Sequence, residues 1–268
     1  MQLHIRHETR YRYERPVKYS VQSLHLTPRR ELSQRALSWS IISPGRRLEQ
    51  LDAHGNISHL LTIEEPHHEI QIVVHGVVET CDTEIRQDDG LLSPLAYLAP
   101  TQLTTANDDL RTLAHQVLYT TTELRARAQG LAEAVFGAVR YAAGTSNVED
   151  DTANALKSGS GLCQDHAHVY IAAARAIGIP ARYVSGYLHT GNNQHAASHA
   201  WVDVWLGAEV GWQSMDITHR RPAVRNYCRL AVGRDYLDAA PVRGVRQAGG
   251  GERLDANVLV SESAQEQQ

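Results

Sequence analysis

The first eighty residues alternate apolar with polar positions, which is the period of a β-strand with one buried face. Turn signals rich in Gly, Pro and Asn divide this alternation into short runs. The runs cover 3–13, 17–26, 35–42, 57–63 and 70–78. Because several short strands separated by turns are typical of antiparallel all-β units, we expect an N-terminal sandwich or barrel-like domain over residues 1–90.

Helical periodicity replaces the strand pattern after a linker that Gly90, Pro94 and Pro100 mark. It predicts helices at about 107–117, 122–139, 152–157 and 163–177, and the strand pattern returns at 181–188, 198–206 and 211–218. The clearest helix, 163–177, starts after a Gly-Ser stretch and ends at Gly178. We therefore expect an α+β domain over 91–247, followed over 248–268 by a C-terminal strand and a disordered tail.

The charge balance narrows the classes of function. The 268 residues include 26 basic and 30 acidic side chains, a net charge of −4, so the chain lacks the basic field that holds nucleic acid or an anionic membrane. The N-terminus carries charges in place of the apolar segment of a secretory signal, and the three cysteines are widely spaced. We expect a cytoplasmic protein with no nucleic-acid or membrane partner, and the oligomeric state stays open.

Cys163 is the cysteine placed to be reactive, because it begins the helix at 163–177. The unpaired backbone N–H groups and the dipole of a helix N-terminus stabilise an anion there, which lowers the pKa of a thiol. The preceding Gly159 and Gly161 leave the approach to the sulfur open. Cys81 and Cys228 are interpreted as structural.

A thiolate nucleophile needs a base, and the base needs an acceptor that orients it. If the turn after the strand at 198–206 centres on Gly207 and Ala208, then His199 and Asp216 lie directly opposite each other on an antiparallel pair. A carboxylate opposite a histidine fixes the imidazole tautomer. Each residue alone is also compatible with a structural role, His199 as a half-buried histidine and Asp216 as a turn cap, but both structural readings weaken beside Cys163.

The remaining histidines give no strong metal signal. His166 and His168 lie on different faces of their helix, and His166 is expected in an exposed first turn. A zinc site of Cys163, His195 and His199 is chemically conceivable, as is a weak site at His67 and His68, but no spacing matches a zinc signature. We expect no metal and no cofactor.

Several motifs together resemble the bacterial transglutaminase-like family. They are Gly161-Leu162-Cys163-Gln164-Asp165-His166-Ala167-His168, the run from Gly178 to Tyr187, Ser198-His199-Ala200-Trp201-Val202, Gly211-Trp212 before Asp216, and residues 229–245. The resemblance covers almost the whole chain and implies a papain-like core with a Cys163–His199–Asp216 triad behind a β-rich N-terminal domain. Two positions depart from the family pattern: Ile217 replaces the usual proline, and Met215 replaces a residue that is often aromatic.

These residues favour a cysteine-dependent amidase or peptidase that acts on a peptide or protein substrate through a thioester. Gln164 is a candidate oxyanion donor, and Trp201 is a candidate wall of the cleft. Three alternatives remain: acyl transfer to an amine by the same triad, an acetyltransferase, and a non-catalytic binding module. We favour hydrolysis over transfer because the polar loop at 189–195 contains no carboxylate to bind an amine.

Overall fold

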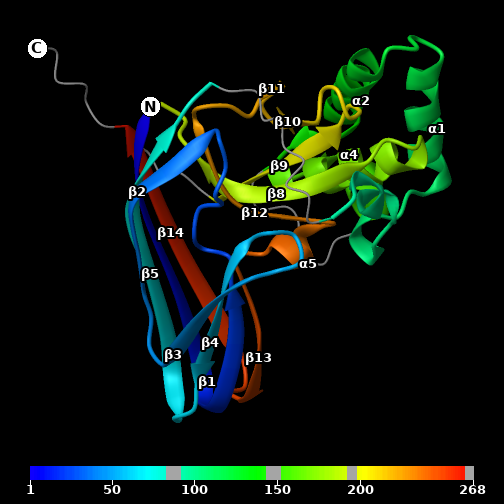
Figure 1. The fold of residues 1–268 in the computed structure, drawn as a ribbon. Coiled ribbons are helices and arrows are strands. Elements are labelled where there is room, and N and C mark those ends of the chain that lie inside the picture. The colour runs from blue at the N-terminus through cyan, green and yellow to red at the C-terminus, as the bar shows by residue number, and fades with distance from the viewer. Residues whose placement is uncertain (83–91, 143–151, 192–197, 263–268) are drawn as a thin grey trace, which may run out of the picture.

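The computed structural model describes residues 1–82, 92–142, 152–191 and 198–262, which fold into a curved β-sheet and an α+β half (Figure 1). The curved sheet is antiparallel and has the order β2-β5-β1-β4-β3, and two further strands pair with β1. Its strands are β1 (Gln2–Leu24), β2 (Gln34–Ile42), β3 (Arg46–Leu51), β4 (Ile57–Ile63) and β5 (His67–Thr80). The expected N-terminal β-domain is confirmed as an antiparallel half-barrel.

The two runs predicted at 3–13 and 17–26 form one long strand, β1. Its pairing with β5 shifts between Arg12 and Val17, where Pro16 interrupts the alternation. Before this shift β1 lies between β5 and β14 (Glu252–Glu262), and after it β1 lies between β4 and β13 (Val242–Ala248). The strand therefore continues through the irregularity because it exchanges both neighbours there.

The C-terminal strands return to the N-terminal sheet, as the blue and red ribbons side by side in Figure 1 show. Strand β14 occupies the C-terminal range in which a strand was expected, whereas all of β13 except Ala248 falls within 91–247, the range assigned to the α+β domain. Strand β13 pairs with β1 of the N-terminal sheet, and these hydrogen bonds are long-range contacts that a local sequence pattern does not contain. The predicted disordered tail extends into residues 263–268, which lie outside the described residues. Gly90 and the start of the predicted linker also lie outside them.

The second half contains the expected α+β core. Its sheet is antiparallel and has the order β11-β10-β9-β8-β12. The strands are β8 (Ala181–Leu188), β9 (Ser198–Trp205), β10 (Trp212–Asp216), β11 (Arg221–Pro222) and β12 (Tyr227–Gly233). The helices are α1 (Asp108–Leu118), α2 (Leu124–Ala138), α3 (Thr152–Ser158), α4 (Cys163–Ala176) and α5 (Tyr236–Ala239), with short 3₁₀ turns η1 (Pro94–Leu98) and η2 (Gln102–Thr104) and the small parallel pair β6 (Arg140–Tyr141) and β7 (Ser160–Gly161).

Helix α4 is the centre of this half. It contacts β8 and β9 on one side and α1, α2 and α3 on the other, so every residue from Asp165 to Arg175 is buried. A helix buried all round needs small or apolar residues on all faces, and the run Ile171-Ala172-Ala173-Ala174 supplies them. This packing fixes the position of the N-terminus of α4, where Cys163 lies.

Apolar packing and buried ion pairs join the two halves. Leu3 and Ile5 of β1 share a buried cluster with Tyr187 of β8 and Leu230 of β12. Glu31, in the connection after β1, bonds the fully buried Arg229, whose guanidinium also reaches Asp203 on β9. Within the described residues, none of the helices is long and apolar enough to cross a membrane.

Candidate active site

Cys163 is the first residue of α4 and is partly exposed. Leu162 is the N-cap, and the carboxylate of Asp165 accepts a hydrogen bond of 2.7 Å from its backbone N–H. This contact closes the first turn of α4 and fixes the direction in which the Cys163 side chain points. The thiol thus lies at the N-terminus of α4, as the sequence predicted.

The other two cysteines differ in environment. Cys228 is buried on β12, and burial raises the pKa of its thiol, which makes it unreactive. Cys81 was interpreted as structural, but it follows the end of β5 and is exposed. It is therefore the accessible thiol against which the reactivity of Cys163 has to be distinguished.

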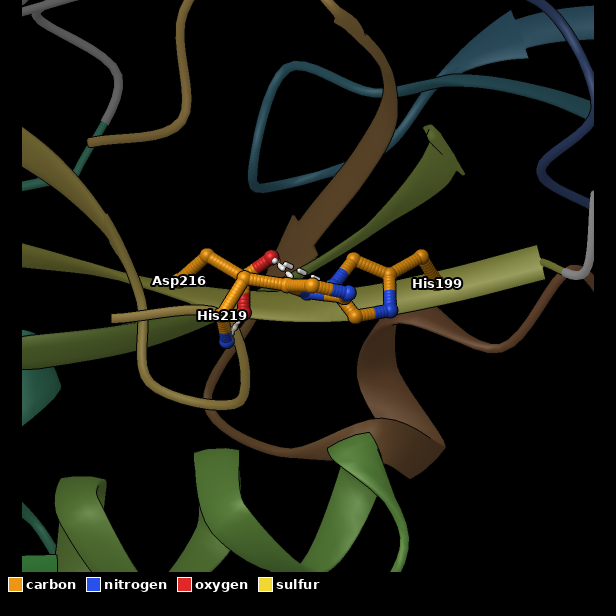
Figure 2. Close-up of side chains that lie close together, drawn as sticks. All are labelled: His199, Asp216 and His219. Atoms are coloured by element: carbon orange, nitrogen blue, oxygen red, sulfur yellow. Dashed lines mark hydrogen bonds and ion pairs between the residues drawn. The ribbon is translucent and has the colours of Figure 1, made fainter. Parts of the chain in front are cut away.

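His199 and Asp216 meet across the β9–β10 hairpin. His199 Nε2 lies 2.7 Å from Asp216 Oδ2, and Figure 2 shows the two side chains directed at each other. The predicted register is wrong by two residues: Met215 pairs with Val202, so His199 is diagonal to Asp216. The turn is longer than expected, because Leu206 and Gly211 close it and both Gly207 and Gly211 have positive φ. A shift of two residues keeps both side chains on one face of the sheet, so the contact survives.

The electrostatics of His199 favour a charged imidazole. Burial lowers its pKa, but hydrogen bonds to Asp216 and Cys163 outweigh burial and raise the pKa to about 9. Asp216 is buried too, yet its bonds to His199 and His219 hold the pKa of its carboxyl well below the usual range. Because Asp216 engages Nε2, the other ring nitrogen, Nδ1, is the one left to serve Cys163.

Two further residues contact Asp216 and were not found from the sequence. His219 Nδ1 lies 2.8 Å from Asp216 Oδ2, and its backbone N–H donates to Oδ1 at 3.1 Å. The Tyr227 hydroxyl, on β12, donates to Oδ2 at 2.7 Å. The spacing of Asp216 and His219, three residues apart in a turn, was the available signal for the first contact. Nothing local in the sequence points to Tyr227.

His199, Asp216 and His219 also form a group that could hold a metal ion, with ligand atoms within 4.8 Å of one another. Both imidazoles, however, lie at hydrogen-bond distance from the same oxygen of Asp216, at 2.7 and 2.8 Å. The three side chains therefore interact directly with one another in this structure. The alternative zinc set depends on His195, which lies outside the described residues.

Three other residues singled out in the sequence, Trp201, Gln164 and His166, lie in different environments. Trp201 is not a wall of an open cleft: it is fully buried, with its ring stacked at 6.1 Å from the His199 ring. Gln164 is the second residue of α4 and partly exposed, and its role as an oxyanion donor stays a prediction. His166 is not in an exposed turn, because its two ring nitrogens bond the Val139 carbonyl and the Thr218 hydroxyl.

Comparison with known proteins agrees with this arrangement. The transglutaminase-like superfamily profile matches residues 111–217, and that of the bacterial transglutaminase-like N-terminal region matches residues 3–79. An uncharacterized Mycobacterium leprae protein is 30% identical over 282 residues, which cover 96% of this chain and 98% of the relative. A protein-glutamine gamma-glutamyltransferase of Pseudomonas aeruginosa is 35% identical over 102 residues, 34% of this chain and 15% of that protein.

One solved structure has a similar fold over nearly the full length. It is a protein of Cytophaga hutchinsonii described as a candidate cysteine protease, with a TM-score of 0.79 and 22% identity. The match covers 97% of this chain and 90% of the other. At this identity the likeness supports the fold alone. With two family profiles in the expected order and a full-length relative, the chain belongs to the transglutaminase-like superfamily, with the bacterial N-terminal region preceding the transglutaminase core.

Proposed function

We propose that this protein is a cysteine-dependent amidase or peptidase, with Cys163 as nucleophile, His199 as acid and base, and Asp216 as the residue that orients His199. The observation that carries the proposal is the position of His199, which bonds Asp216 on one side and Cys163 on the other. With a pKa of about 9, the imidazole is protonated at neutral pH, and in this proposal Cys163 attacks as a thiolate beside it.

The proposed reaction has two halves. The Cys163 thiolate attacks the amide carbonyl carbon, and a C–S bond forms as the carbonyl electrons move onto oxygen. When the tetrahedral species collapses, the C–N bond breaks and the His199 imidazolium gives its proton to the departing amine. Water then attacks the thioester and passes a proton to His199, and the C–S bond breaks to release a free acid and regenerate the thiolate.

The N-terminus of α4 supports the charge that develops on the carbonyl oxygen. The backbone N–H of Cys163 is in the first turn, where a helix supplies no internal acceptor. The helix dipole adds to this stabilisation. We propose this N–H as one oxyanion donor and the Gln164 side chain as the second.

Trapping the acyl-enzyme tests this function. The full chain is mixed with a library of peptide amides, quenched in acid to preserve any thioester, and digested for mass spectrometry. We expect an acyl group on Cys163, none on the exposed Cys81, and none after Cys163→Ala. Turnover of an accepted peptide with no acyl group on Cys163 would contradict the role of this cysteine. Binding without any acyl group or turnover would instead favour a non-catalytic module.

Transfer of the acyl group to an amine is the second candidate, and the named activity of the Pseudomonas relative favours it. Water at 55 M has roughly a 10⁵-fold concentration advantage over a sub-millimolar amine, about 7 kcal/mol, so transfer needs a dedicated amine pocket. A labelled primary amine supplied with an accepted peptide separates the two reactions. We expect free acid to form faster than labelled amide, and the reverse order would identify a transferase.

A further inference from the structure

Asp216 is an unusually crowded acceptor. Its Oδ2 atom receives the ring nitrogens of His199 and His219 and the hydroxyl of Tyr227, at 2.7, 2.8 and 2.7 Å. The side chain has 0% exposure, so protein groups rather than bulk water surround it. Figure 2 shows the two imidazoles approaching the same carboxylate from different segments of the chain. A triad needs one of these donors, and the other two need a separate explanation.

We propose that His219 and Tyr227 are positioning residues, which hold the Asp216 carboxylate against His199 and thereby keep His199 in place beside Cys163. This inference rests on the proposed function, because it assigns roles around the same three residues. His219 makes two hydrogen bonds to the carboxylate, one through its ring and one through its backbone N–H, in the short turn after β10. Tyr227 holds the same oxygen from β12.

The direction of each hydrogen bond follows from the charge of Asp216. An ionised carboxylate only accepts, so each of its three partners must present a hydrogen. Tyr227 therefore donates to Asp216, and its oxygen accepts from Arg221 Nε at 2.9 Å. His199 presents Nε2–H, which leaves Nδ1 to exchange a proton with Cys163. The surroundings of Asp216 thus select the imidazole tautomer that a cysteine nucleophile requires.

His219 is the informative member because it lies at the surface. Its side chain is 40% exposed, so its removal opens a path for water to Asp216 without emptying the core. Two further ionisable side chains near Asp216 are Arg221 on β11, which bonds Tyr227, and His166 on α4, which bonds Thr218. Both side chains bond these other partners, so neither replaces the hydrogen-bond donor that His219→Ala removes.

The effect of His219→Ala is expected at Cys163. A freer, hydrated Asp216 stabilises the His199 imidazolium less, which should move the alkylation of Cys163 to higher pH. A displacement of the profile by one pH unit lowers the rate about tenfold on its acidic limb. His219→Asn should retain most of the reactivity, because its side-chain amide nitrogen is as many bonds from Cα as Nδ1 of histidine. Tyr227→Phe should reduce reactivity while keeping the ring in the core.

Alkylation by iodoacetamide tests this without knowledge of the substrate. Its rate at Cys163 is measured from pH 4 to 9 in a Cys81→Ser background, for the parent, His219→Ala, His219→Asn and Tyr227→Phe. His115→Ala, at an exposed position on α1, is the matched control. Far-UV circular dichroism and urea midpoints show whether each variant folds. The rate for His219→Ala is interpreted only if its urea midpoint is close to that of the parent. If it is not, the test uses Tyr227→Phe and His219→Asn.

The expected result is a parent that reacts at pH 6, a His219→Ala profile that is displaced to higher pH with a rate about tenfold lower on its acidic limb, and recovery with His219→Asn. Profiles of His219→Ala and Tyr227→Phe that both superimpose on the parent would overturn the positioning role and leave the proposed function intact. A His219→Asn variant that is as slow as His219→Ala would also overturn it, because the donor would not be what matters. A parent thiol that titrates like an ordinary cysteine would overturn both the ion pair and this inference.

Discussion

Replacing Asp203 with asparagine should destabilise this protein more than most surface or core changes. Asp203 lies on β9 with 0% exposure and bonds two arginines that are almost as deeply buried. Arg182 donates to it at 2.9 Å, and Arg229 donates to both of its oxygens. The Ser214 hydroxyl donates as well. Asparagine keeps the shape of the side chain, but it removes the charge and replaces one acceptor oxygen with an NH2 group that faces other donors.

The magnitude follows from burial. Arg182 and Arg229 are 1% and 2% exposed, so neither guanidinium can recover its hydration when the carboxylate is lost. Arg229 keeps Glu31 as a partner, but two buried cations then share one fewer anion. Removing one member of a buried ion pair costs about 3–5 kcal/mol, a large share of the roughly 5–15 kcal/mol that stabilises a typical domain.

Urea unfolding at pH 7, followed by far-UV circular dichroism, measures the change. The matched control is Glu133→Gln, which breaks the pair with Arg220 at 55% and 52% exposure and should cost at most about 1 kcal/mol. If Asp203→Asn costs no more than this control, the argument from buried charge is wrong for this network. Equal slopes in urea are needed for the comparison to report stability alone.

A comparison of the parent with Asp203→Asn at different pH values gives a second test. Its two arginine partners hold the pKa of Asp203 well below the usual range. The carboxylate therefore contributes its full stabilisation above the unfolded-state pKa of about 3.9, and this contribution is lost as pH falls below that value toward the folded-state pKa. The difference between the parent and Asp203→Asn should be constant from pH 7 to about 5 and should shrink below pH 4.

Two further predictions concern packing and acid sensitivity. Gly186→Ala should destabilise the core strongly, because the added Cβ would lie 2.5 Å from the Trp201 ring and 2.1 Å from a β12 carbonyl oxygen; urea midpoints check this, and a parent-like midpoint would contradict it. Burial lowers the pKa of His168 to about 4, and its Nε2 accepts the Tyr236 N–H at 3.0 Å, so the folded state keeps it neutral. Since the unfolded chain binds that proton below about pH 6.5, stability should fall by up to about 3 kcal/mol between pH 6.5 and 4, and unfolding free energies for His168→Gln should depend less on pH over this range.

The sequence predicted best the elements whose burial follows a simple period. The helix expected at 163–177 is α4, Cys163–Ala176, and the strand expected at 198–206 is β9, Ser198–Trp205. Strand β3, Arg46–Leu51, was missed because all six of its residues are exposed, so no apolar alternation marks it. It exists because its backbone pairs with β4 at the edge of the sheet, and such pairing leaves no periodic trace in the sequence.

The candidate site likewise contains residues that the sequence predicted and residues that it did not. Residue type and position relative to predicted elements were enough to select Cys163, His199 and Asp216, which the structure brings together. The roles of Trp201 and Tyr227 could not be predicted, because they depend on which strands are neighbours. The burial of Trp201 became evident only from the sheet order, which places β12 beyond β8 in the same sheet and brings the Tyr227 ring to 5.2 Å from the Trp201 ring.

The buried ion network and the strand residues of the candidate site lie on one face of the second sheet. On each of three strands, a site residue and a network residue stand two or four positions apart, and the even spacing puts both on the same face. A slip of one residue in any strand would move both to the opposite face and leave buried charges unpaired. The network therefore penalises the wrong registers and, by the same constraint, holds the site in place. The pairs are His199 and Asp203 on β9, Asp216 and Ser214 on β10, and Tyr227 and Arg229 on β12.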